Sequence, residues 1–298
     1  KFKLDRSKSG KVIYKITQED LQKVKGQSLE QTINTVSGIE ITGSRSTPGT
    51  NLSYRIRGGN NHQVVILVDG VQVSDPSSIN SDFDLRLLDV NLIESVEIIK
   101  GGISTLYGTG ATTAVISITT KQPKEEQVRA TAYMTAGSNR VVVTDKYKLN
   151  TATFGANVNG KAGKFSYLAA ASVEHAKGMS AAQSGDSNVV FEDDPFERTN
   201  ATVKLGYDLF DSFKLSGFAN YNRFKNQYDG GSGFDAFNQA SSENIQVGLS
   251  PEYKYRKGSI VLNASLAQTE RNFEKTSFPG IYESNTVVAD LYNKYKFS

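Results

Sequence analysis

The sequence predicts a small α+β domain in residues 1–122, followed by antiparallel strands of a transmembrane β-barrel in residues 123–298. Three observations predict this fold class. The first part mixes short helical and strand patterns, whereas the second forms about eight long segments in which apolar and polar residues alternate strictly. Tight turns and long polar loops also alternate between these segments, as in outer-membrane barrels, whose short turns face the periplasm.

The first part has helix and strand signals of ordinary length. Residues 18–21 and 27–30 open two short amphipathic stretches, and Gly38 ends the second. The run 64–68 is continuous and β-branched, as expected for a strand buried on both faces, and Asp-Gly follows it as a turn signal. Runs 96–99 and 114–118 have the same character. These residues therefore predict an α+β domain with its own core.

The second part alternates over longer stretches than soluble strands usually do. Val203, Leu205 and Tyr207, for example, alternate with Lys204 and Gly206. The segments begin near residues 126, 151, 164, 198, 213, 243, 259 and 286. Short turns are expected at 161–163, 211–212 and 257–258, and long loops around 177–196, 227–241 and 273–285.

Aromatic residues near the segment ends resemble the girdles of membrane barrels: Tyr147, Tyr167, Tyr207, Phe210, Phe213, Tyr253 and Tyr255. A soluble antiparallel sandwich would also alternate. Segment length and the asymmetry of the loops favour the barrel.

Eight strands would make a barrel too narrow to enclose a separate domain, and plugged outer-membrane barrels have about 22 strands. We therefore expect this chain to be the N-terminal part of a longer polypeptide, whose remaining strands complete the barrel. The alternating pattern of residues 285–298 stops without the partner strand that an open edge in lipid would require.

Composition excludes several classes of function. No run approaches the ~18 apolar residues of a membrane helix, and the chain has no cysteine. Its net charge of +3 is spread without a basic block, so nucleic acid is not an expected partner. No catalytic triad, zinc spacing or phosphate-binding glycine loop occurs, so we expect neither an enzyme nor a redox or nucleotide cofactor.

Three motifs carry a family resemblance across residues 10–121. They are Ser-Tyr-Arg-Ile-Arg-Gly at 53–58, Val-Ile-Leu-Val-Asp-Gly-Val at 65–71, and Ile-Glu-Ser-Val-Glu-Ile-Ile-Lys-Gly-Gly at 93–102, continued by Leu-Tyr-Gly at 106–108 and Val-Ile-Ser-Ile-Thr-Thr-Lys at 115–121. The chain thereby closely resembles the TonB-dependent receptor family. Gly102 stands where the family usually has proline, and Thr-Thr-Ala at 112–114 replaces its glycine pair; both departures concern local loop shape.

The resemblance implies a plug domain inside a barrel in the outer membrane of a Gram-negative bacterium. It implies active import of a scarce, large ligand, energised by the TonB-ExbB-ExbD complex. The TonB box, which would add to TonB as a strand, is not evident in residues 1–9; either it lies upstream, as we expect, or it has been lost from this chain. The resemblance also suggests that four charged side chains of the plug form polar contacts with the barrel wall: Arg55, Arg57, Glu94 and Glu97.

Residues 174–240 resemble, less strongly, the cobalamin receptors of this family. In those receptors aspartates of neighbouring extracellular loops bind calcium, which takes six to eight oxygen ligands. The positions implied here are Asp186, Asp193, Asp194, Asp229 and Asp235, and Glu192 lies in the same acidic loop. The alternative is a solvated acidic loop without a metal.

The resemblance places the floor of the ligand site in plug loops 44–51 and 74–80. These loops are rich in Ser, Thr, Pro, Gly and Asn, which suits hydrogen bonding to a polar ligand. The candidate ligand-binding residues are Thr50, Asn51, Pro76, Ser77, Ser78, Asn80 and, from the barrel, Tyr228. His62 and His175, the only histidines, are interpreted as incidental.

The ligand is left open by the sequence. The leading hypothesis is cobalamin or a related corrinoid; a ferric siderophore, haem or a glycan would suit the same machinery. A ligand-binding barrel or adhesin without energy coupling is a third hypothesis, and a soluble β-rich binding module a fourth. Outer-membrane lipid is an expected partner, and a surface lipoprotein is a further candidate.

Overall fold

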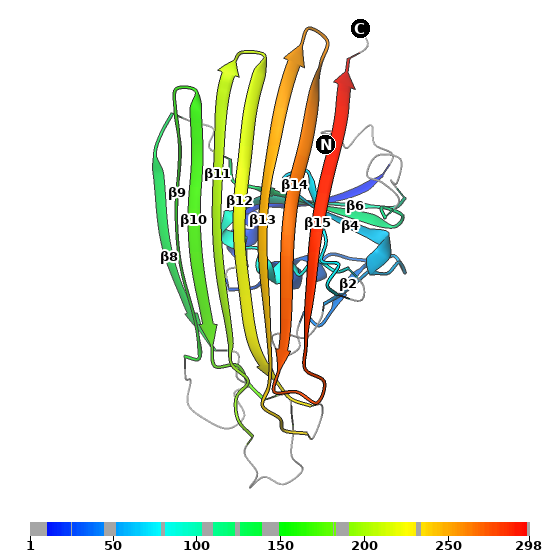
Figure 1. The fold of residues 1–298 in the computed structure, drawn as a ribbon, viewed down its shortest axis with the longest axis vertical. Coiled ribbons are helices and arrows are strands. Elements are labelled where there is room, and N and C mark those ends of the chain that lie inside the picture. The colour runs from blue at the N-terminus through cyan, green and yellow to red at the C-terminus, as the bar shows by residue number, and fades with distance from the viewer. Residues whose placement is uncertain are drawn as a thin grey trace.

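The structure is a computed structural model that describes residues 11–24, 26–44, 52–78, 81–102, 110–122, 126–138, 149–180, 182, 191–230 and 234–296. It has two parts (Figure 1). Described residues up to 122 form the N-terminal domain. The remainder form one large sheet, here called the wall.

Five strands make the main sheet of the N-terminal domain, in the order β1-β6-β7-β4-β5. Neighbours are antiparallel except β4 and β7, which are parallel. A separate antiparallel pair joins β2 to β3. The strands are β1 (Val12–Thr17), β2 (Ile39–Thr42), β3 (Ser53–Ile56), β4 (Val64–Val68), β5 (Val71–Val73), β6 (Ile93–Lys100) and β7 (Ala114–Thr120).

Two short helices follow β1, as the sequence predicts: α1 (Gln18–Lys23) and α2 (Leu29–Asn34). Thr17 caps α1, because its side chain accepts a hydrogen bond from the Asp20 backbone N–H and the Asp20 carboxylate accepts one in return. The described part of the domain also contains three single 3-10 turns: η2 (Asn61–Gln63), η3 (Leu85–Leu87) and η4 (Val90–Leu92).

The N-terminal domain has a mainly aliphatic core. Ile116 and Ile118 of the central strand β7 are fully buried, as are Leu29 and Ile33 on one face of α2. The expected apolar core is present in this domain. The helices named here are short, and among the described residues none is long and apolar enough to cross a membrane.

The wall consists of eight antiparallel strands in chain order. They are β8 (Arg129–Gly137), β9 (Thr151–Ala162), β10 (Phe165–Ala176), β11 (Phe196–Phe210), β12 (Phe213–Tyr228), β13 (Asn238–Tyr255), β14 (Gly258–Glu274) and β15 (Gly280–Tyr295). Two-residue turns join β9 to β10, β11 to β12 and β13 to β14, all at one end of the wall (Figure 1). Eight strands and short turns at one end were both predicted.

Two strands begin earlier than predicted. β13 begins at Asn238 and β15 at Gly280, so the connection after β14 spans only residues 275–279. The long loop expected at 273–285 is therefore wrong. Polar pairs such as Glu270 with Glu283 continue the strand ladder beyond the apolar stretch, and backbone pairing there does not need the alternation that the sequence prediction relied on.

The two faces of the wall differ in chemistry. One register row crosses all eight strands on the outer face and is entirely apolar: Ala130, Val158, Ala169, Val203, Ala219, Val247, Leu266 and Val287. The adjacent row on the inner face holds no large apolar residue: Thr131, Asn157, Ala170, Thr202, Asn220, Gln246, Ala267 and Thr286. Leu266 is 56% exposed, whereas Asn157 is 6% exposed. This inversion suits strands that face lipid outside and a filled interior inside.

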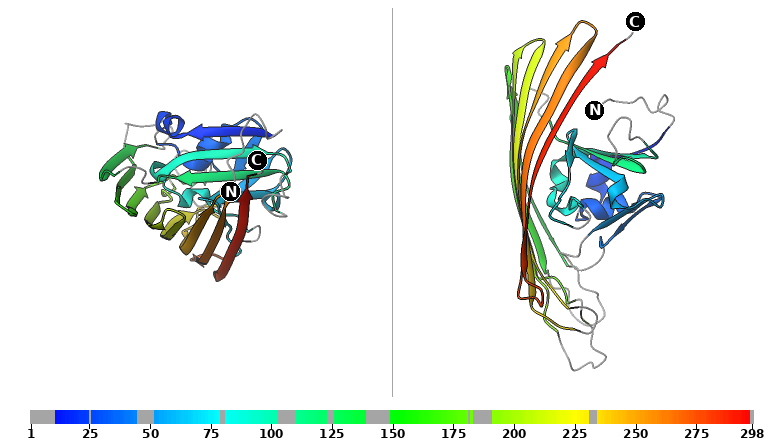
Figure 2. Two further views of the ribbon diagram at one scale, coloured as in Figure 1. Left: turned by 90° about the horizontal axis from the view of Figure 1, so that it is seen from above. Right: turned by 45° about the vertical axis from the view of Figure 1, so that its right-hand side comes forward.

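The N-terminal domain lies against the concave, inner face of the wall, which curves round one side of it (Figure 2). Phe196, Phe224 and Ala176 of the wall join the apolar core of the domain. The two parts thus form one packed unit whose contacts, described next, are largely polar.

Candidate ligand site and calcium centre

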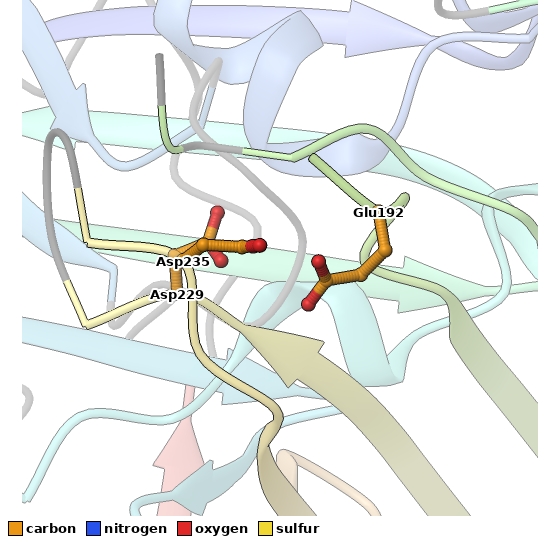
Figure 3. A group of neighbouring side chains, drawn as sticks. All are labelled: Glu192, Asp229 and Asp235. Carbon is orange, nitrogen blue, oxygen red and sulfur yellow. The ribbon is translucent and has the colours of Figure 1, made fainter. Parts of the chain in front are cut away.

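Three carboxylates meet near the long-loop end of the wall (Figure 3). Glu192 precedes β11, and Asp229 and Asp235 belong to the β12–β13 connection. One oxygen from each lies within 4.8 Å of the others. The β10–β11 and β12–β13 connections, far apart in sequence, are brought together at this cluster.

Asp229 is held in place by hydrogen bonds from both connections. Its Oδ2 accepts from the Ala182 backbone N–H at 2.7 Å and from the Ser180 hydroxyl at 2.8 Å. Its Oδ1 accepts from the Ala236 backbone N–H at 3.2 Å. Asp229 therefore has a fixed position, which pre-orients a potential metal ligand.

The cluster concentrates negative charge. Loss of solvent, together with Glu192 and Asp229 nearby, raises the pKa of Asp235 to about 6. Oε1 of Glu192 is buried and has no hydrogen-bond partner among the described residues. A divalent cation would neutralise this repulsion and satisfy the buried oxygen. Hard carboxylate oxygens suit calcium, with backbone oxygens or water needed to complete its coordination.

The structure brings together some of the predicted calcium ligands. Asp229 and Asp235 belong to the cluster, but Asp193 and Asp194 do not, although both follow Glu192 closely in the chain. Asp194 is instead 2% exposed. Asp186 lies outside the described residues. Glu192 was not predicted as a ligand; its place in the acidic loop was the available signal, but chain geometry decides which of three consecutive acids points inward.

Asp75 organises the described part of the predicted ligand floor, residues 74–78. Its side chain accepts from the Ser77 backbone N–H at 3.0 Å, and its carbonyl accepts from the Ser78 hydroxyl at 3.1 Å. Pro76 lies in the same turn. Arg271 of β14 donates through Nε to Asp75 Oδ2 at 2.8 Å, and its Nη2 forms an ion pair with the same oxygen at 2.8 Å. This loop is therefore attached directly to the wall.

The other predicted ligand residues are only partly located. Tyr228 is the last residue of β12, next to Asp229. Thr50, Asn51 and Asn80 lie outside the described residues. Contact of any of them with a ligand stays a prediction.

Further polar contacts join the domain to the wall at mid-height. Lys204 Nζ of β11 contacts both Asp69 and Thr120, and Asp69 also accepts from Thr120 N and Oγ1 at 2.8 Å each. Tyr133 of β8 donates to Asp89 at 2.6 Å. Asn263 of β14 donates to the Gly70 carbonyl at 3.2 Å. These contacts come from the strand ends and turns of the domain, not from its core.

A buried charged group lies at the boundary between α2, η3 and the wall. Burial would raise the pKa of Asp84, but the charge and hydrogen bonds of Arg86 outweigh burial and lower it. The two side chains pair through Nε at 2.9 Å and Nη2 at 2.7 Å. Arg86 and Arg198 each lie over the Phe224 ring, at 5.4 and 5.6 Å from its centroid. Arg198 also pairs with Glu174 at 3.2 Å.

The four charges predicted to contact the wall are placed differently. Glu97 pairs with Lys15 of β1 at 2.9 Å, within the domain. Arg55 and Arg57 are exposed to solvent, and Glu94 is half-buried on β6. Their contact with a barrel wall stays a prediction, whereas Asp69, Asp75 and Asp89 are the carboxylates that reach the wall described here. In the sequence, Asp69 was interpreted only as part of the Asp-Gly turn signal at 69–70, so its contact with the wall was not predicted.

The fold and contacts define a plug domain seated inside the wall of an outer-membrane β-barrel. Residues 5–115 match the family model of the TonB-dependent Receptor Plug Domain. This part of the chain is therefore similar to the plug domain of TonB-dependent receptors. The N-terminal domain is called the plug from here on.

The names of the similar proteins mention two kinds of ligand. The chain is 23% identical over 286 residues to the vitamin B12 transporter BtuB of Photobacterium profundum, covering 95% of this chain and 44% of the relative. It is 26% identical over 272 residues to that of Vibrio vulnificus, covering 91% and 41%. A ferric enterobactin receptor of Pseudomonas aeruginosa is 34% identical over 122 residues, covering 37% and 16%.

Solved structures share the fold. The siderophore receptor PirA of Acinetobacter baumannii superposes with a TM-score of 0.75 at 18% identity, covering 94% of this chain and 44% of that one. A mutant of the ferric enterobactin receptor PfeA of Pseudomonas aeruginosa gives 0.72 at 18%, covering 94% and 45%. The chain thus spans less than half the length of these relatives.

Proposed function

We propose that this chain serves TonB-dependent active import of a large, scarce ligand across the outer membrane, and that the ligand is cobalamin or a related corrinoid. The observation that carries the import mechanism is a plug with its own core that is joined to the wall mainly by polar contacts. TonB-ExbB-ExbD would supply the energy by pulling on the plug.

Polar contacts suit a plug that must move. Each Lys204–Asp69 or Arg271–Asp75 contact can be exchanged for contacts with water when force is applied, so its net contribution is modest. An interface of packed aliphatic side chains would instead expose apolar area at about 25 cal/mol per Å². The interface described here therefore favours displacement of plug segments over a permanent seal.

Two observations favour cobalamin. The curated relatives that cover nearly all of this chain are named as vitamin B12 transporters. The Glu192, Asp229 and Asp235 cluster also fits calcium, which would tie the β10–β11 and β12–β13 connections together. Loops ordered in advance lose less conformational entropy when a ligand binds.

Calorimetry on the complete protein in detergent tests ligand and metal together. Cyanocobalamin is titrated with calcium present and again with a chelator. Tight binding that weakens on chelation is expected. Asp229→Asn should weaken calcium binding because it removes one charged oxygen ligand, whereas Asp193→Asn, outside the cluster, should leave it unchanged. Absence of cyanocobalamin binding in both conditions would remove the cobalamin assignment and leave the family intact.

A ferric siderophore is the second candidate, because both a relative and several structural neighbours are siderophore receptors. A ferric catecholate complex is an anion, and the carboxylates at this end of the wall would repel it. Titration with ferric enterobactin, haem and a glycan panel decides among these cargoes. Cellular uptake that persists after the proton gradient is collapsed would instead support a barrel without energy coupling.

A further inference from the structure

The short-turn end of the wall carries an excess of basic residues. We define the basic rim as residues 161–164, 208–214, 252–258 and 294–296. It holds three acidic residues, Asp208, Asp211 and Glu252, and eight basic ones: Lys161, Lys164, Lys214, Lys254, Arg256, Lys257, Lys294 and Lys296. The rim is therefore a positively charged edge in the part of the wall that the structure describes.

The opposite end of the wall carries a row of three acidic residues on its outer face. Glu243, Glu270 and Glu283 are direct cross-strand neighbours on β13, β14 and β15. Like charges in register are unfavourable for strand pairing, so folding alone does not account for this row. Arg223 of β12 continues this row beside Glu243, at 3.9 Å, so the row is acidic on β13, β14 and β15.

The basic rim lies where phospholipid headgroups meet the barrel. Exposed aromatic side chains Phe165, Tyr207, Tyr253 and Tyr295 mark the edge of the apolar belt at this end. Arg256 and Lys257 form the turn that follows β13, immediately beyond this level. Basic side chains just outside an aromatic girdle can extend their apolar stems along the lipid and place their charges among the phosphates.

Some basic residues of the rim form contacts within the wall, and others do not. Lys161 pairs with Asp208 at 3.1 Å, and Lys164 donates to the Leu209 carbonyl at 3.3 Å. The side chains of Arg256 and Lys257 are exposed and form no hydrogen bond or ion pair with another described residue. These two charges are therefore available to an external anion.

We propose that the basic rim binds the phosphate headgroups of anionic phospholipids in the periplasmic leaflet. The occupant is a lipid headgroup because the basic residues lie immediately beyond the apolar belt of the same strands. One lipid molecule can therefore contact the belt with its acyl chains and the basic rim with its phosphate. A basic residue near an anionic membrane surface contributes attraction that falls off within a Debye length, about 10 Å at 0.1 M salt. The contact fixes the depth at which the short-turn end sits.

Lipid retention on the complete protein tests the proposal. The protein is reconstituted in vesicles of phosphatidylcholine with phosphatidylglycerol, extracted in mild detergent, and the retained lipids are measured by mass spectrometry. The rim variant is Arg256→Gln, Lys257→Gln and Lys296→Gln together. The matched control, at the long-loop end, is Lys177→Gln, Arg223→Gln and Lys225→Gln. Both change the same number and types of basic residue.

We expect the wild-type protein and the control to retain phosphatidylglycerol severalfold above its share in the vesicle, and the rim variant to retain it near that share. Extraction in high salt should reduce retention by the wild type to the level of the rim variant. Equal retention by rim and control variants, or no enrichment in the wild type, would overturn the proposal. A folded rim variant is confirmed by an unchanged heat-induced gel shift, so loss of lipid is separable from loss of the barrel.

Discussion

The plug and the wall place their apolar side chains on opposite sides. The plug buries them in its interior, whereas the wall exposes them on its outer face. In the plug, aliphatic side chains such as Ile116 and Ile118 are fully buried in the interior. In the wall, Val247 and Leu266 are 44% and 56% exposed on the outer face, while Asn157 and Gln246 are buried facing the plug. The difference shows that the solvent on each side, water or lipid, decides which face of a sheet is apolar.

The boundary between the plug and the wall contains both apolar and polar contacts. Its apolar part is small and includes Phe224, whereas three plug carboxylates reach polar groups of the wall. The plug is consequently stable as a folded unit but attached by contacts that water can replace. The predictions below change one side of this contrast at a time.

Truncation of an apolar side chain should affect the two regions most unequally. Ile116→Ala removes packed atoms from the closed plug core and should cost about 2–5 kcal/mol of plug stability. Val247→Ala faces lipid chains that can fill the gap, so its cost should be far smaller. Hydrogen–deuterium exchange of plug and wall amides in the complete protein measures both. Equal loss of protection in the two variants would contradict the assignment of inner and outer faces.

A charge on the outer face should be costly only within the apolar belt. Leu266→Arg places a guanidinium in lipid and should reduce barrel stability by about 2–4 kcal/mol. Glu270→Arg, four residues along the same strand and on the same face, lies beyond the belt and should cost nothing measurable. Urea titration of folding into lipid vesicles reports the free energy of each. If Glu270→Arg reduced barrel stability measurably, Glu270 would lie within the apolar belt, and the edge of the belt assigned here would be wrong.

Breaking one plug–wall contact should have an intermediate effect. Lys204→Met leaves Asp69 without its cation, and hydrogen bonds to charged groups contribute about 1.5–3 kcal/mol. Asp69 has a φ of 51°, so Asn is the suitable replacement because it tolerates that conformation. A cycle of Lys204→Met, Asp69→Asn and the double variant, read by exchange protection of β4 and β7, isolates the pair. Additive single effects would show that the two residues do not interact.

Much of this contrast could be predicted from the sequence. The continuous apolar run at 64–68 indicated a buried strand, and alternation from 198 onward indicated a lipid-facing one. Strand ends were harder, because β13 and β15 begin with polar residues whose backbone pairing leaves no hydrophobic period. The alternation also indicated that Lys204 faces inward, but nothing near it in sequence identified Asp69, 135 positions away, as its partner.

The candidate site was only partly predictable for a related reason. Resemblance supplied Asp229 and Asp235, and the cluster contains both. Glu192 stands beside Asp193 and Asp194 in an acidic run, and composition cannot say which side chain of such a run turns toward another loop. That choice depends on contacts between connections distant in sequence, such as the Asp229 bond to the Ala182 backbone.

The smallest expected effect concerns a carboxyl that the plug buries at its boundary with the wall. Burial raises the pKa of Glu30 above its ordinary value, and Oε2 has no hydrogen-bond partner among the described residues. Because the folded state then holds a proton that the unfolded chain releases, plug stability should fall as pH rises from 4.5 through the raised pKa. Glu30→Gln should remove that fall, and Glu40→Gln, on an exposed position of β2, should retain it. Thermal unfolding of both variants between pH 4 and pH 8 provides the measurement. A stability that increases across this range in the wild type and in Glu40→Gln, with a flat Glu30→Gln curve, would show that Glu30 is charged in the folded plug.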